Sequence, residues 1–188
     1  HAGGLTVLHR NSGKMESFNQ LNSQLVNENV YAILPDKGGN LLLGTLSALV
    51  SFNPEKKSFT TIDKEKDGTP FTSQRITILF RDSHKRLWVG GEEGISVFQQ
   101  EGIEIEKVPI LPESSVTKTF TNCIYEAANG IIWVGTREGF YCFNEKEKKI
   151  KRYTTANGLP NNVVYGILED TFGRLWVSTN RGISCFNP

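Results

Sequence analysis

The sequence DTFGRLWVSTNRGISCF, at residues 170–186, carries the pattern from which the fold can be predicted. A hexapeptide inside it, RLWVST at Arg174–Thr179, returns as RLWVGG at Arg86–Gly91 and as IIWVGT at Ile131–Thr136. A fourth copy, NLLLGT at Asn40–Thr45, has Leu where the others have Trp. The anchors of the four copies, which are separated by 46, 45 and 43 residues, are Leu42, Trp88, Trp133 and Trp176. A period near 45 residues is the size of one four-stranded blade of a β-propeller.

The residues around each anchor repeat as well. A phenylalanine follows ten residues after every anchor, and Gly or Ala stands four residues before that phenylalanine. Six residues before the anchor stands Asp36, Asp82 or Asp170, with Ala127 as the exception. An Asp at this place favours the start of a turn, since its carboxylate accepts backbone N–H groups. We therefore interpret these Asp residues as turn residues, and we expect no metal site and no cofactor.

The pattern predicts an all-β fold, a β-propeller with about four blades of four antiparallel strands, part of a seven-bladed propeller. In the second complete repeat the expected strands lie near 75–81, 86–90, 95–99 and 103–108. The opening residues Gly4–Leu8 reproduce Gly94–Phe98, so we expect the chain to begin in the third strand of a blade. The expected units are a partial blade at 1–20 and blades at about 25–65, 70–110, 118–155 and 160–188. A closed four-bladed ring and the association of two copies as a dimer, through their exposed edge strands, are the alternatives.

Composition narrows the function classes. The formal net charge is +1, which argues against a nucleic-acid-binding protein, and no apolar run approaches the length of a membrane span. We expect this chain to be attached to a membrane only through other parts of a parent chain. Cys123, Cys142 and Cys185 are expected to be small buried residues, because an odd number of cysteines does not make a disulfide framework. The three tryptophans are expected in the core.

The stretches at residues 82–98 and 170–186 resemble the repeat of the two-component regulator propeller family, as does the lead-in at Asn157–Asp170. The resemblance covers nearly the whole chain, with departures at Leu42, Ala48, Ala127 and Ser178. It implies a periplasmic sensor region of an inner-membrane hybrid two-component regulator, followed in the parent chain by a histidine kinase and a response regulator. In gut Bacteroidetes, the resemblance further implies, such regulators sense oligosaccharides and control polysaccharide-utilisation genes. No kinase motif lies in this chain, so this segment is expected not to be an enzyme.

Blade connectivity predicts where a ligand would bind. The segment that leads into the first strand and the loop between the second and third strands share one face of a blade. The lead-in segments are 27–29, 73–75, 119–122 and 161–162, and the loops are 45–47, 91–93, 136–138 and 179–181. The candidate ligand-binding residues on that face are Asn27, Asn29, Arg75, Glu92, Phe120, Asn122, Arg137, Asn161, Asn162 and Arg181. Amide and guanidinium groups bind sugar hydroxyls or carboxylates, and Tyr31, Phe120 and Tyr165 are placed to stack on a sugar ring.

Other readings stay open. The asparagines could instead satisfy turns and the charges keep loops solvated. The same loops could bind a protein, making the chain an interaction scaffold. A propeller lyase or hydrolase is disfavoured, because the histidines are only His1, His9 and His84 and no catalytic set is evident. The partner predicted first is an oligosaccharide or another small polar ligand.

Overall fold

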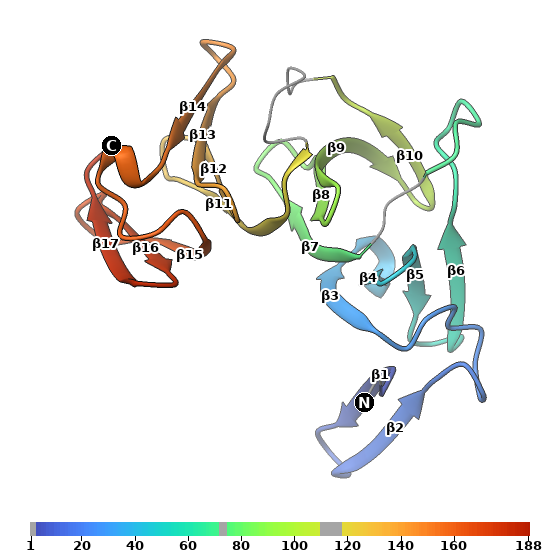
Figure 1. Ribbon diagram of the computed structural model, residues 1–188. Helices are drawn as coiled ribbons and strands as arrows, with labels where there is room; N and C mark the ends of the chain where they lie inside the picture. The colour runs from blue at the N-terminus through green and yellow to red at the C-terminus, as the bar shows by residue number, and fades with distance from the viewer. Residues whose placement is uncertain (1–2, 72–74, 110–117) are drawn as a thin grey trace.

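The computed structural model of the chain describes residues 3–71, 75–109 and 118–188. Residues 73–74 of one predicted lead-in segment, together with His1, lie outside these described residues. Within them the strands form separate antiparallel sheets arranged as an arc, with the N-terminus and the C-terminus at its two ends (Figure 1). The all-β propeller architecture is therefore confirmed.

Each sheet of three or four strands is one blade, and its strands follow one another in chain order from the inside of the arc outward (Figure 1). A leading hairpin of β1 (Leu5–His9) and β2 (Lys14–Phe18) precedes the blades. Blade 1 contains β3 (Val30–Pro35), β4 (Leu41–Thr45), β5 (Leu49–Asn53) and β6 (Ser58–Ile62). Blade 2 contains β7 (Ile76–Arg81), β8 (Leu87–Gly91), β9 (Gly94–Glu101) and β10 (Glu104–Lys107). Blade 3 contains β11 (Thr121–Glu126), β12 (Ile132–Thr136), β13 (Phe140–Asn144) and β14 (Lys149–Tyr153). Blade 4 contains β15 (Val164–Glu169), β16 (Leu175–Thr179) and β17 (Gly182–Phe186). Short 3-10 turns lie at Lys37–Gly39 and Thr155–Asn157.

The sequence repeat sets the register of every blade. The residue before the anchor pairs with the repeated phenylalanine, as Leu87 pairs with Phe98 and Leu175 with Phe186. Since successive residues of a strand point to opposite faces, this constant register puts the same repeat positions on the same side of each blade.

The core lies between blades. Each hydrophobic cluster joins two successive sheets; Trp88 and Val97 of blade 2, for example, pack with Ile132 and Tyr141 of blade 3. The glycine two residues after the anchor makes this close packing feasible. At Gly44, a Cβ atom would lie 2.6 Å from Cγ2 of Ile76, the first residue of β7. That glycine is therefore required by the approach of the next blade.

The predicted burial of tryptophans and cysteines holds only in part. Trp88 and Trp133 are 0% and 2% exposed, but Trp176 is 40% exposed. Cys123 and Cys142 are half-buried, and burial raises the pKa of the Cys123 thiol to about 12, whereas Cys185 is exposed. The expectation was wrong for Trp176 and Cys185, because no sheet of the described chain covers that side of blade 4.

Candidate functional site

The predicted lead-in segments and loops do meet on one face, which we call the lead-in face. In three blades the second residue of the loop donates its backbone N–H to the residue just before the first strand. Leu46 donates to the carbonyl of Asn29 at 3.1 Å, Arg137 to that of Phe120 at 3.1 Å, and Asn180 to that of Val163 at 3.3 Å. Arg75, which leads into blade 2, donates to the carbonyl of Leu46 at 2.7 Å and so joins the loops of neighbouring blades.

A β-bulge recurs at the start of every first strand. The pairing of the first and second strands shifts at the second residue of β3, β7, β11 and β15, which is Tyr31, Thr77, Asn122 and Tyr165 in turn. Bulges re-aim a side chain, and here two of these residues bind the following blade. Thr77 Oγ1 donates to the carbonyl of Thr121 at 3.1 Å, and Asn122 Nδ2 donates to that of Val164 at 2.8 Å.

Most of the predicted asparagines form hydrogen bonds to backbone groups of nearby turns. Asn27 Oδ1 accepts from the backbone N–H of Asn29 at 2.8 Å, and Asn161 Oδ1 accepts from that of Val163 at 2.8 Å. Asn162 Oδ1 accepts from Thr155 N at 2.8 Å. These bonds stabilise the turns through which the chain enters blades 1 and 4, a common use of asparagine.

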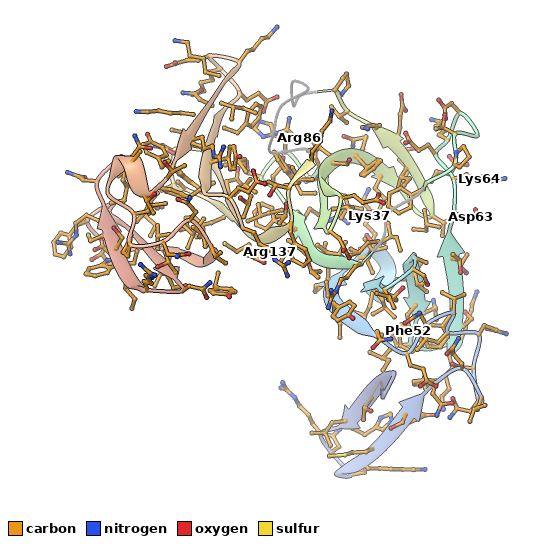
Figure 2. The ribbon with its side chains drawn as sticks, in the orientation of Figure 1. Lys37, Phe52, Asp63, Lys64, Arg86 and Arg137 are labelled. Atoms are coloured by element: carbon orange, nitrogen blue, oxygen red, sulfur yellow. The ribbon has the colours of Figure 1, made fainter. Side chains whose placement is uncertain are left out.

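Two of the predicted arginines lie over aromatic rings on the lead-in face. The Arg137 guanidinium carbon lies 4.0 Å from the centroid of the half-buried Phe120 ring, and that of Arg75 lies 5.5 Å from the Tyr31 centroid. Figure 2 shows Arg137 where β12 ends, on the inner side of the arc. Both distances fall within the range of cation–π attraction.

Arg75 is held in an unusual way. Its backbone φ is +50°, a left-handed conformation, and its Nε is buried without a hydrogen-bond partner among the described residues. Such strain costs a non-glycine residue about 1–2 kcal/mol and is retained where the surrounding structure fixes it.

The remaining predicted residues, Glu92 and Arg181, lie at different positions of the loop between the second and third strands. Glu92 is exposed at the place in blade 2 that Arg137 has in blade 3. Arg181 is also exposed, but Asn180 occupies the matching place in blade 4. Asn180 Oδ1 accepts from the hydroxyl of Tyr165 at 2.8 Å, a pair that sequence reasoning missed. Nothing in the repeat reveals the bulge that places Tyr165 there, so the signal was absent from the sequence.

The opposite face carries the turns and is built of ion pairs. Arg86 binds Glu145 of blade 3 through two bonds of 2.7 and 2.8 Å, and this bonding lowers the pKa of Glu145. Arg81 and Gln100 of blade 2 both donate to Asp36 of blade 1. His84 lies exposed in the turn that contains Asp82 and Arg86. The bonds of Arg81, Gln100 and Arg86 join one blade to the next, which indicates a structural role for these three residues.

Neither a metal centre nor a membrane helix is found in the part of the chain that the structure describes. Residues 3–71, 75–109 and 118–188 contain no group of three or more His, Cys, Asp or Glu side chains able to hold a metal ion. Across the same ranges, no helix has the length and apolar character needed to cross a membrane.

Known proteins share both the repeats and the fold. The sequence model of the family described as "Two component regulator propeller" matches residues 114–138 and 158–181. Over 161 residues, 81% of this chain, the sequence is 29% identical to histidine kinase P4 of Formosa agariphila, of which the match covers 12%. The fold is similar to extracellular domains named as parts of two hybrid two component systems of B. thetaiotaomicron. Their TM-scores are 0.79 and 0.78 at 21% and 23% identity, and each match covers all of this chain and 25% of theirs.

The chain thus spans an eighth to a quarter of these relatives, and the two structural likenesses concern the fold alone. The family match falls on the lead-in segments and anchor strands of blades 3 and 4, where the repeat motif was found in the sequence. The repeats of blades 3 and 4 therefore match the two-component regulator propeller family.

Proposed function

We propose that this chain is part of the extracytoplasmic, periplasmic sensor region of a hybrid two-component regulator, in which it binds an oligosaccharide. The parent protein would be a sensor histidine kinase joined to a response regulator, and its output would be the control of polysaccharide-utilisation genes. This segment would supply binding and no catalysis. The observation that supports the proposal most strongly is the similarity, along most of the chain, to a histidine kinase.

The geometry of the lead-in face supports a binding role. Its loops are held together by backbone hydrogen bonds within and between blades, so that side chains of different repeats lie on one surface. Binding sites are commonly formed by loops that a rigid scaffold positions. The residue just before the first strand differs from blade to blade: it is Asn29 in blade 1, Arg75 in blade 2 and Phe120 in blade 3. The anchor residues, by contrast, are apolar in every blade.

The test is ligand-dependent phosphorylation of the full-length protein in membrane vesicles. Vesicles are incubated with labelled ATP and with a panel of neutral and acidic oligosaccharides, and incorporation of phosphate is measured. We expect one class of oligosaccharide to change the phosphorylation rate severalfold. A protein that incorporates no phosphate, or that binds no oligosaccharide of the panel, would contradict the proposal.

A protein-interaction scaffold is the second candidate, and one observation favours it. Leu168, Trp176 and Ile183 form an exposed apolar side of blade 4, where a shallow hollow of about 290 Å³ lies between them. Exposed apolar patches are typical of protein contacts. If the full-length protein bound another protein through this side of blade 4 and bound no oligosaccharide, the scaffold function would be better supported than the sensor function.

A further inference from the structure

Two aromatic residues of the lead-in face, Tyr31 and Phe120, have an arginine over one side of the ring, whereas Tyr165 is exposed and has no such arginine among the described residues. The guanidinium of Arg137 lies 4.0 Å from the centre of the Phe120 ring, so it occupies one face of that ring. Arg75 lies over Tyr31 at a longer distance of 5.5 Å. A pyranose ring that stacks on an aromatic side chain needs that face itself. Phe120 and Tyr31 therefore act as supports for arginines.

An arginine laid on an aromatic ring is well suited to bind an anion. The ring holds the planar guanidinium in place, and its N–H groups remain free at the edges to donate to two oxygens at once. Among the described residues, neither Arg75 nor Arg137 forms an ion pair within 4.0 Å. By contrast, Arg81, Arg86 and Arg174 each have a carboxylate partner.

The positions of the two arginines place them on the same surface. Arg75 leads into blade 2 and bonds the loop of blade 1, while Arg137 lies in the loop of blade 3 and bonds the segment that leads into that blade. Both belong to the lead-in face, on either side of blade 2, and the loop of blade 2 contributes Glu92 between them. The strained backbone and the unpaired Nε of Arg75 indicate that its side chain is held in place without an anionic partner from the described chain.

We infer that Arg75 and Arg137 form an oxyanion-binding pair, and that the ligand is an acidic oligosaccharide bearing carboxylate or sulfate groups. This inference rests on the proposed function and narrows it to one class of ligand. Each guanidinium donates two N–H groups to one acidic group of the ligand, while Tyr31 and Phe120 fix the guanidinium planes. The Tyr165–Asn180 pair of blade 4 offers a neutral hydrogen-bonding position on the same face.

The experiment is calorimetric titration of the full-length protein with matched pairs of oligosaccharides. Oligogalacturonates are compared with their methyl esters, and sulfated chondroitin oligosaccharides with the desulfated products, at 50 and 300 mM salt. The variants are Arg137→Gln, Arg75→Gln and Arg137→Lys. Arg10→Gln is the control, because Arg10 is an exposed arginine in the β1–β2 turn, on the opposite face of the propeller.

We expect one acidic member to bind at least tenfold more tightly than its neutral partner, with an affinity that falls as salt increases. Arg137→Gln and Arg75→Gln should each weaken that binding about ten- to a hundredfold, Arg137→Lys by less, and Arg10→Gln not at all. Whether the carboxylate or the sulfate pair shows the preference identifies the group that is bound.

Two results would overturn the inference while leaving the sensor role intact. One is equal or tighter binding of the neutral partners, and the other is an equal loss of affinity in Arg10→Gln and Arg137→Gln. If no oligosaccharide of either kind binds, the proposed function and the inference fall together.

Discussion

The carboxylate of Asp82 shows how one turn residue holds a tryptophan in the core. Its Oδ1 accepts from the backbone N–H of Arg86 at 2.8 Å, while Oδ2 accepts from Arg86 Nε at 2.7 Å and from Trp88 Nε1 at 2.8 Å. The sequence predicted the turn and its backbone bond. The bond to the indole was missed, although the constant spacing of six residues between Asp and Trp was visible.

Replacing Asp82 by Ala should destabilise the chain strongly. The change leaves the indole N–H of Trp88 and the guanidinium of Arg86 without this partner inside blade 2, and breaking a buried charged pair costs about 3–5 kcal/mol. Urea unfolding followed by tryptophan fluorescence measures the loss. Asp170→Ala is the matched comparison and should cost less, because Trp176 is 40% exposed whereas Trp88 is fully buried; an equal loss would contradict this explanation.

Blade 3 lacks the Asp that binds the tryptophan of blade 2 and the Arg that binds that Asp, and its own tryptophan is left without a hydrogen-bond partner among the described residues. Ala127 stands in the Asp position and Ile131 in the Arg position, and the buried Trp133 Nε1 has no hydrogen-bond partner among the described residues. The double substitution Ala127→Asp with Ile131→Arg should supply both partners and raise the free energy of unfolding by about 1–3 kcal/mol, the cost of an unsatisfied buried group. Ala127→Asp alone should destabilise, since its charge would lack the arginine. Thermal unfolding of the single and double variants checks both signs.

The small residue two positions after the anchor sets how closely the sheets of two neighbouring blades approach each other. A Cβ atom at Gly135 would collide with Cys123 Sγ of β11 and lie 2.7 Å from Cγ1 of Val164, the first residue of β15. We therefore expect Gly135→Ala to displace the Cys123 side chain, to separate β12 from β15 and to destabilise by about 1–3 kcal/mol, as overpacking does. Gly166→Ala is the control, because there the nearest atom is Ser178 Oγ at 3.1 Å. A chemical denaturation series that gave both variants the same small loss would contradict this role of the glycine.

The turns of neighbouring blades are joined by an ion pair whose strength depends on pH. Hydrogen bonding from Arg86 holds the pKa of Glu145 below its ordinary value of 4.5. The pair therefore stabilises the fold fully above that value, and its contribution is lost as pH falls through the lower, folded-state pKa. Glu145 is 41% exposed, so Glu145→Gln should cost at most about 1 kcal/mol at pH 7. Unfolding curves measured from pH 7 to well below pH 4.5 should show this difference shrink as the pH falls; a constant difference would contradict the assignment.

In the whole molecule, the side of each blade that bears the anchor is covered by the blade that follows, except on blade 4. There Leu168 and Ile183 are exposed together with Trp176, on the same side that blade 4 covers in blade 3. This arrangement is that of about four blades of a larger propeller, as the similarity to larger extracellular domains also indicates. The total of seven blades and the association of two copies stay predictions.

Much of this architecture was predictable from the sequence, because the period, the anchors and the turn residues act locally within one repeat. The predicted strands of blade 2 lie within one or two residues of β7 to β9. The side chains of the lead-in face were harder to predict, since their partners come from other segments of the same blade or from neighbouring blades. The stacking of Arg137 on Phe120 and the bond from Tyr165 to Asn180 depend on distances between segments that the repeat does not encode, whereas the use of Asn27 in a turn is local and was one of the open interpretations.

The measurement that tests the account most directly is hydrogen–deuterium exchange of the full-length protein, with and without an acidic oligosaccharide that it binds. If the lead-in face is the binding site, peptides spanning 27–31, 75–77, 119–122 and 136–138 should exchange more slowly in the presence of ligand. The turns at 36–40, 82–86 and 127–131, on the opposite face, should not change. Protection confined to those turns, or absent from the lead-in face, would contradict the placement of the site.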